Sequence, residues 1–232
     1  VAARYRRGET SHAELIKLHS LAAGSPGLLA PATQAAKIGA GIQSSDDIPK
    51  AGLSTLGPDL RLSLGRAAVF GIAANSSGLA AAAGISERAA DELIMQWQQL
   101  LLAYPVGKLW ALQPSLRPGL LAVLSPEERA AAEEAAAAFL RDLAEEGQAS
   151  VLGLSRLDAL LEARGHYLAA GDTPAARSVT SRISSYLVRR GYYAEVIRQN
   201  LPLLPLQTHP EPMNWIAQAF MELGNFSKAA EW

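Results

Sequence analysis

Histidine and serine are the residue types in this sequence that could support metal or nucleophilic chemistry, and their spacing builds neither site. His12 and His19 lie seven residues apart on one expected helix face, but no carboxylate is placed to complete a metal site with them. The chain has no Cys, which excludes cysteine-ligated zinc and disulfides. No Gly-x-Ser-x-Gly motif occurs. We interpret the four histidines as surface or interdomain residues and expect no catalysis and no metal site in this chain.

Phosphate-binding motifs and membrane segments are also missing from the sequence. The only Gly-Lys pair, Gly107-Lys108, is followed by Leu109, so no GxxxxGK[ST] loop exists and the chain is not a complete P-loop ATPase. A net charge of −1 argues against binding to a nucleic-acid backbone. No apolar run reaches about 18 residues, and "VAARYRRGET" is no signal peptide. We expect a cytoplasmic protein without a membrane span.

Charge is distributed unevenly near the C-terminus. Residues 125–146 carry a net charge of −5 and residues 173–200 a net charge of +4. The basic segment could dock an acidic partner or an acidic part of the same protein. The alternative is that both segments are solvated helix faces. The candidate partner-binding residues are Arg182, Arg189, Arg190 and Trp215. The other tryptophans, Trp97, Trp110 and Trp232, are expected in the core or between helices.

The elements that must position these residues are mainly helical. Ala is abundant and few segments alternate with a period of two, which favours helix over strand. Residues 1–42 are expected to form a helical module. Residues 43–57 have the composition of a linker. Residues 58–124 form the next predicted domain, and residues 125–232 are expected to be wholly helical.

The sequence of 58–124 predicts three helices, a short β-hairpin and a last helix. Pro58 suits the first position of a helix, and Ser86 suits the N-cap of the third helix. The hairpin is expected over 102–112, with its turn at Val106-Gly107. This order of elements is that of a winged-helix domain. The third helix would be its recognition helix, but "SERAADEL" has a net charge of −2, so we expect it to pack on another domain and not on DNA.

A repeat signal runs through residues 157–232. Gly191 and Gly224 lie 33 residues apart, and each is followed two residues later by an aromatic residue, Tyr193 and Phe226. A weaker copy begins at Gly171. This pattern resembles the tetratricopeptide repeat (TPR), in which Gly turns the chain in the left-handed conformation and the aromatic residue packs between two helices. An irregular helical bundle is the alternative interpretation.

Taken in order, a Gly-x-Pro module, a winged helix and TPR-like repeats resemble the C-terminal part of signal-transduction ATPases of the STAND class, which includes NB-ARC proteins. "GSPGLLA" carries the Gly-x-Pro motif, and the resemblance implies that Gly24 and Pro26 lie near the adenine of ATP or ADP. "LWALQPSLRPGLL" matches the end of the family's winged helix, with Arg117 in its helix. Gln113 stands where the family has a phosphate-sensing His, and its amide could still donate a hydrogen bond.

We therefore predict a mainly α fold: a helical module, a winged-helix domain and an α-α superhelix of TPR-like hairpins. The preferred function is the regulatory and sensing segment of a STAND-type switch, with ATP or ADP held by an upstream ATPase domain and a protein or peptide bound by the repeats. The alternatives are a non-enzymatic TPR scaffold and a transcriptional regulator. Because the chain starts at Val1 and stops within a repeat motif at Trp232, we expect a piece of a larger protein.

Overall fold

The computed structural model describes Leu53 and residues 56–100, 102–206 and 209–232. The fold is mainly α with one two-stranded sheet, as the sequence predicts. The chain divides into two compact units, residues 1–132 and 133–232, and the boundary between them falls within one helix. The predicted helical module of residues 1–42 and most of the predicted linker lie outside the described residues. The division into four segments stays a prediction.

The described part of the first unit has the predicted order of elements. Three helices come first and a β-hairpin follows. These elements are α4 (Pro58–Ala67), α5 (Ser76–Ala83), α6 (Glu87–Gln99), β1 (Ala103–Val106), β2 (Leu109–Leu112), the 3-10 helix η2 (Pro114–Leu116) and α7 (Arg117–Leu121). Their helix starts follow the local sequence: Pro58 opens α4, and the side chains of Asn75 and Ser86 cap α5 and α6.

The hairpin turns one residue later than expected. Val106 pairs with Leu109, so Val106 belongs to β1 and the turn consists of Gly107 and Lys108. Gly107 has a φ of +63°, a conformation that Gly adopts without the steric cost of a Cβ. The predicted turn at Val106-Gly107 is therefore wrong, because the left-handed position that Gly107 supplies is the first residue of the loop.

The core of the first unit is centred on two tryptophans. Trp97 of α6 and Trp110 of β2 are buried and meet edge to face, with ring centroids 5.6 Å apart. Ala74, just before α5, exchanges two backbone hydrogen bonds of 2.9 Å with Trp110. Trp110 of the hairpin is thereby held by the Trp97 ring of α6 and by the backbone of Ala74.

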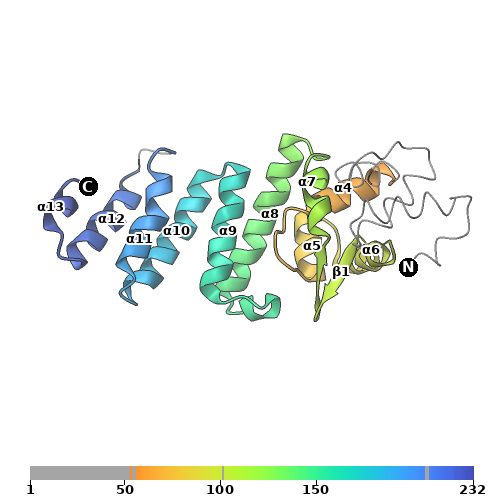
Figure 1. The fold of residues 1–232 in the computed structure, drawn as a ribbon, viewed down its shortest axis with the longest axis horizontal. Helices are drawn as coiled ribbons and strands as arrows, with labels where there is room; N and C mark the ends of the chain where they lie inside the picture. The colour runs from red at the N-terminus through yellow and green to blue at the C-terminus, as the bar shows by residue number, and fades with distance from the viewer. Residues whose placement is uncertain (1–52, 54–55, 101, 207–208) are drawn as a thin grey trace, which may run out of the picture. The chain divides into compact units, whose positions relative to one another are not determined.

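The second unit is built from helices joined by short turns (Figure 1). Within it α9 packs on α10, α10 on α11, α11 on α12 and α12 on α13. The elements after α7 are α8 (Pro126–Glu145), which spans the boundary between the units, η3 (Ala149–Leu152), α9 (Arg156–Ala170), α10 (Thr173–Val188), α11 (Tyr193–Asn200), η4 (Leu201–Leu203), α12 (Pro210–Glu222) and α13 (Phe226–Ala230). No helix in the described residues is long and apolar enough to cross a membrane.

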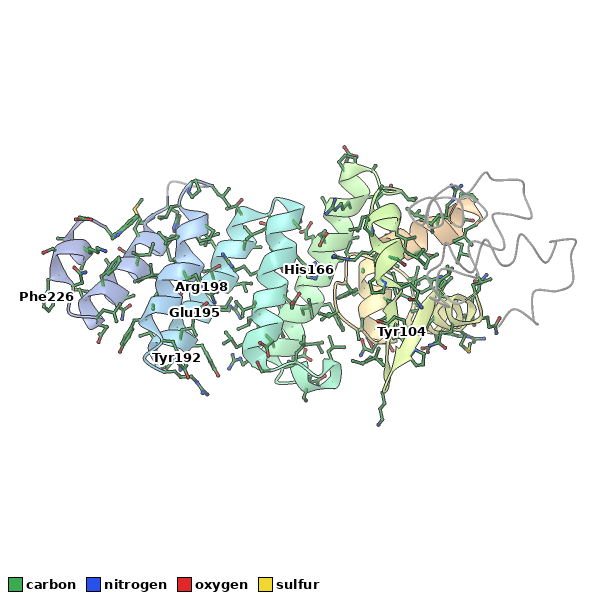
Figure 2. All side chains as sticks on the ribbon, in the orientation of Figure 1. Tyr104, His166, Tyr192, Glu195, Arg198 and Phe226 are labelled. Carbon is green, nitrogen blue, oxygen red and sulfur yellow. The ribbon has the colours of Figure 1, made fainter. Side chains whose placement is uncertain are left out.

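The repeat glycines behave as predicted, but one repeat aromatic does not. Gly171, Gly191 and Gly224 have φ values of +80°, +76° and +72°, and each ends a turn between helices. Tyr193 packs against the core of the second unit. Phe226 is 71% exposed and points away from the fold in Figure 2, so its predicted place between helices is wrong. Phe226 is the first residue of α13, which is five residues long and has no buried residue.

The predicted burial of the tryptophans is also confirmed in part. Trp97 and Trp110 are core residues as predicted, and Trp215 is half-buried on α12. Trp232, which follows α13, is 41% exposed, so its predicted burial is wrong.

Candidate functional site

A hollow of about 660 Å³ lies in the first unit beside the hairpin. It is lined by the loop after α4, by both strands and by the start of α7. Most of the lining is apolar, and the half-exposed Tyr104 and Val106 of β1 form part of it. Arg117 supplies the one charged side chain among the lining residues. A volume of this size falls in the range of small-molecule sites.

The guanidinium of Arg117 is engaged with the backbone. Its Nε donates to the carbonyl of Ala68 over 2.9 Å, and its Nη2 donates to the carbonyl of Val69 over 3.1 Å. Ala68 is the C-cap of α4, so the cation meets carbonyls that the helix leaves without intrahelical partners. Arg117 therefore fastens the start of α7 to the end of α4, 48 residues earlier in the chain.

Of the four residues predicted to contact a nucleotide, only Gln113 and Arg117 lie in the described part of the chain. Gly24 and Pro26 lie outside the described residues. Gln113 is half-buried between β2 and η2, and its backbone N–H donates to the carbonyl of Leu102 over 3.0 Å. Arg117 lines the hollow whereas Gln113 does not. The role of these residues at a nucleotide stays a prediction.

A second concavity, of about 390 Å³, lies between α9, α10 and α12 of the second unit. We call it the arginine groove. Its lining includes three arginines and two aromatic residues, together with two serines and a leucine, and it contains no carboxylate. The arginines are Arg156, Arg182 and Arg189, and the aromatic residues are Tyr186 and Trp215. Of the predicted partner-binding residues, Arg182, Arg189 and Trp215 meet here.

Arg190, the remaining predicted partner-binding residue, lies next to the groove. Its guanidinium stacks on the Tyr186 ring at 4.5 Å from the centroid. Trp215 donates from its indole N–H to the hydroxyl of Ser181 over 3.2 Å, which fixes the ring against α10. The structure therefore brings three of the four predicted partner-binding residues to one groove, and their use as a binding site stays a prediction.

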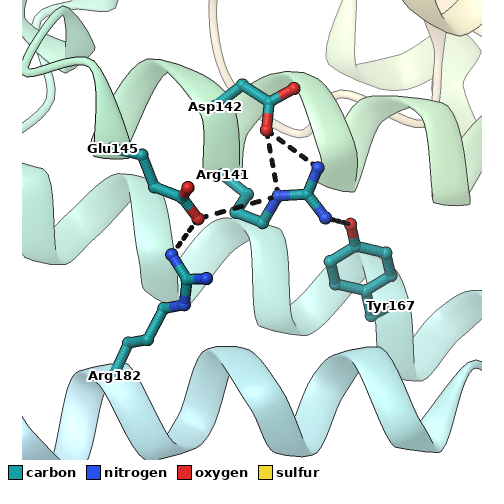
Figure 3. A network of polar contacts seen from close by, with 5 residues as sticks. All are labelled: Arg141, Asp142, Glu145, Tyr167 and Arg182. Carbon is teal, nitrogen blue, oxygen red and sulfur yellow. Dashed lines mark hydrogen bonds and ion pairs between the residues drawn. The ribbon is translucent and has the colours of Figure 1, made fainter.

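A polar network links α8, α9 and α10 next to the groove (Figure 3). Arg141 donates to the Asp142 carboxylate over 2.8 and 2.9 Å and to the Tyr167 hydroxyl over 2.9 Å. Glu145 forms an ion pair with Arg182 and lies 3.8 Å from Arg141 Nε. The hydrogen bonds that Arg141 donates to Asp142 raise the pKa of Arg141, and burial raises the pKa of Tyr167. At neutral pH Arg141 is therefore positively charged and Tyr167 keeps its hydroxyl proton.

A buried pair of titratable residues was missed by the sequence analysis. His166 of α9 and Glu133 of α8 are 7% and 4% exposed, and His166 Nδ1 lies 2.6 Å from a Glu133 carboxylate oxygen. The interpretation of His166 as a surface or interdomain residue is therefore wrong. No group of three potential metal ligands occurs among the described residues.

The separation of contacting residues could have revealed this pair. Glu133 and His166 lie 33 residues apart, Ser181 and Trp215 lie 34 apart, and Arg164 donates to Gln199 across 35 residues. These separations match the repeat period of about 34 residues. Polar side chains one period apart are therefore candidates for contact between the helices of successive repeats.

Comparison with known proteins shows what this fold resembles. No protein-family model and no curated protein sequence matches the chain. The fold is similar to that of a signal transduction ATPase with numerous domains (STAND) protein with a tetratricopeptide repeat sensor from Pyrococcus horikoshii. The TM-score is 0.50 at 16% identity, over 99% of this chain and 38% of that chain. The predicted likeness to STAND proteins is thereby confirmed at the level of the fold, and this chain spans well under half of that protein's length.

Proposed function

We propose that this chain is the regulatory and sensing segment of a STAND-type ATPase switch and acts in the cytoplasm. In this proposal residues 58–124 form a winged-helix domain that packs against an ATPase domain. The ATPase domain holds ATP or ADP, with Gln113 and Arg117 on the side that faces the nucleotide. The helical repeats bind a protein or peptide, and the bound ligand favours one of two conformations because its affinity for the two differs.

The observation that carries the proposal is the extent of the fold likeness. It includes both the hairpin-bearing unit and the repeats, and it covers 99% of this chain. The acidic exposed face of α6 supports a protein partner for this unit and disfavours DNA. Glu87 and Glu92 are exposed there, and Arg88 is paired with Glu92 over 3.3 Å.

A non-enzymatic scaffold is the second candidate, and the arginine groove favours it. Repeats that bind a peptide through such a groove need no nucleotide. A transcriptional regulator of related architecture would require DNA contacts by another element, since the exposed face of α6 is acidic.

The test is nucleotide-dependent change in the full-length natural protein. Its coding sequence upstream of Val1 should contain a P-loop, and backbone amides of α4 to α7 should exchange with solvent at different rates with ATP and with ADP. Gln113→Ala should weaken nucleotide binding about fivefold, as loss of one hydrogen bond does. Gln99→Ala, on an exposed position of α6, is the matched control and should bind as the wild type does.

Two outcomes would contradict the switch. The absence of a P-loop upstream would remove the nucleotide from the proposal. Identical exchange with ATP and ADP, in a protein that binds both, would remove the coupling. Either result would leave the scaffold as the better account.

A further inference from the structure

The arginine groove concentrates positive charge over a partly apolar floor. Leu160 is buried at its base, and Trp215 contributes an indole ring whose N–H is already bonded to Ser181. Arg156, Arg182 and Arg189 are exposed around it. A ligand in this groove would therefore meet guanidinium groups at its edges and an apolar surface at its centre.

The three arginines are engaged to different degrees by the protein itself. Arg189 donates to the carbonyl and the hydroxyl of Ser185, and neither acceptor is charged. Arg156 has no hydrogen-bond or ion-pair partner in the described part of the chain. Arg182 alone is paired with a carboxylate, that of Glu145. The groove therefore keeps an uncompensated positive charge that a negatively charged ligand would offset.

We propose that the arginine groove binds a short acidic peptide segment, whose carboxylates engage Arg156, Arg182 and Arg189 while an apolar side chain lies on Trp215. The planar guanidinium presents paired donors that match a carboxylate. The Glu145 carboxylate already sits on Arg182 and shows that this side chain accepts such a partner in place. The groove volume, about 390 Å³, suits a few side chains of an extended segment and not a folded surface.

Binding has a consequence for the network in Figure 3. Glu145 is ion-paired with Arg182 and also with Arg141, whose Nε is 3.8 Å away. A ligand carboxylate on Arg182 competes with Glu145, which would keep its ion pair with Arg141. The ion pair between α8 and α10 is then lost, while the ion pair within α8 remains. Because this loss makes the bound and free arrangements different, it would supply the differential affinity that a sensor requires. Peptide binding at the groove deepens the proposed function, in which the repeats bind a protein or peptide, but it does not depend on the nucleotide part of that proposal.

The experiment is calorimetric titration of the chain at low salt with the peptide acetyl-Glu-Glu-Leu-Glu-Glu-amide. The matched peptide acetyl-Gln-Gln-Leu-Gln-Gln-amide, inorganic phosphate and a five-nucleotide RNA serve as comparison ligands. We expect the acidic peptide to bind and the three others to bind at least about tenfold more weakly, because guanidinium–carboxylate pairs supply most of the affinity. Absence of binding by the acidic peptide overturns the proposal, as does equal or tighter binding of any comparison ligand.

Substitutions locate the site. Arg156→Gln, Arg182→Gln and Arg189→Gln should each weaken peptide binding about fivefold, the loss expected for one charge-assisted hydrogen bond. Arg198→Gln is the matched control, because it removes the same charge from an exposed arginine of α11 outside the groove. An equal loss in Arg198→Gln would mean that overall charge and not the groove binds the peptide, and would overturn the assignment.

A second pair of variants tests the competition at Arg182. Glu145→Gln releases Arg182 and should tighten peptide binding, whereas Glu134→Gln removes the same charge from an exposed position of α8 and should change it less. Equal effects would contradict the competition step. None of these measurements requires a nucleotide, so their failure would leave the nucleotide response of the proposed switch untouched, and the reverse also holds.

Discussion

The hollow beside the hairpin and the arginine groove both contain arginine, but they hold it in different ways. In the hollow, Arg117 gives its hydrogen bonds to the carbonyls at the end of α4. In the groove, Arg182 makes a surface ion pair with Glu145, whose side chain is 36% exposed, and Arg189 bonds only to Ser185. A guanidinium fixed to backbone carbonyls mainly stabilises the fold. One held by an exposed carboxylate can exchange that partner for a ligand.

The buried pair of His166 and Glu133 should show the largest effect on stability, because it is a polar contact of the second unit that is not on the surface. His166→Leu removes the imidazole next to Glu133 and should lower the free energy of unfolding by about 3–5 kcal/mol. The measurement is urea denaturation followed by circular dichroism.

The control for this pair is the double variant Glu133→Leu with His166→Leu. It should recover much of the loss, because no carboxylate then remains buried at this position. If the single variant lowers the free energy of unfolding by less than about 1 kcal/mol, the pair contributes no more than a surface contact does. Burial would then not distinguish polar groups that stabilise this unit from those that can exchange their partner.

Arg117→Met tests the structural role assigned to the hollow. The variant keeps most of the aliphatic chain and loses both hydrogen bonds to the end of α4, so we expect a loss of about 2 kcal/mol in the free energy of unfolding. Arg66→Met is a useful companion, since Arg66 donates to the carbonyl of Ala83 over 2.9 Å and should show a smaller loss from its one bond. An unchanged unfolding curve for Arg117→Met would contradict the structural role of these two hydrogen bonds.

Local features of the fold could be predicted from the sequence because their causes are local. Ser86 and Ser125 cap helices through bonds to residues three positions away, and both caps are present. The Glu128 carboxylate accepts a hydrogen bond from the backbone N–H of Ser125 and so completes a capping box. The repeat turns follow in the same way from glycines that adopt positive φ.

The contacts that define the candidate sites could not be predicted, because they join distant residues. Nothing near Arg117 in the sequence indicates the carbonyls of Ala68 and Val69, and nothing near His166 indicates Glu133. The two wrong expectations for aromatic burial have a related cause. A motif can place Phe226 at an interhelical position, but burial also needs a neighbouring helix to cover that position.

Arg182→Met should have the smallest effect on stability. Its ion pair with Glu145 joins side chains that are 48% and 36% exposed, so solvent screens the attraction and we expect a change below about 1 kcal/mol in the free energy of unfolding. Measuring the same variant in 1 M salt should abolish the difference, because charges at the surface are then screened over about 3 Å. A loss as large as that of Arg117→Met would show that Arg182 is also fixed by the fold. Arg182 could then not exchange Glu145 for a ligand. Breaking its ion pair with Glu145 would cost too much free energy for a ligand carboxylate to separate α8 from α10 at this contact.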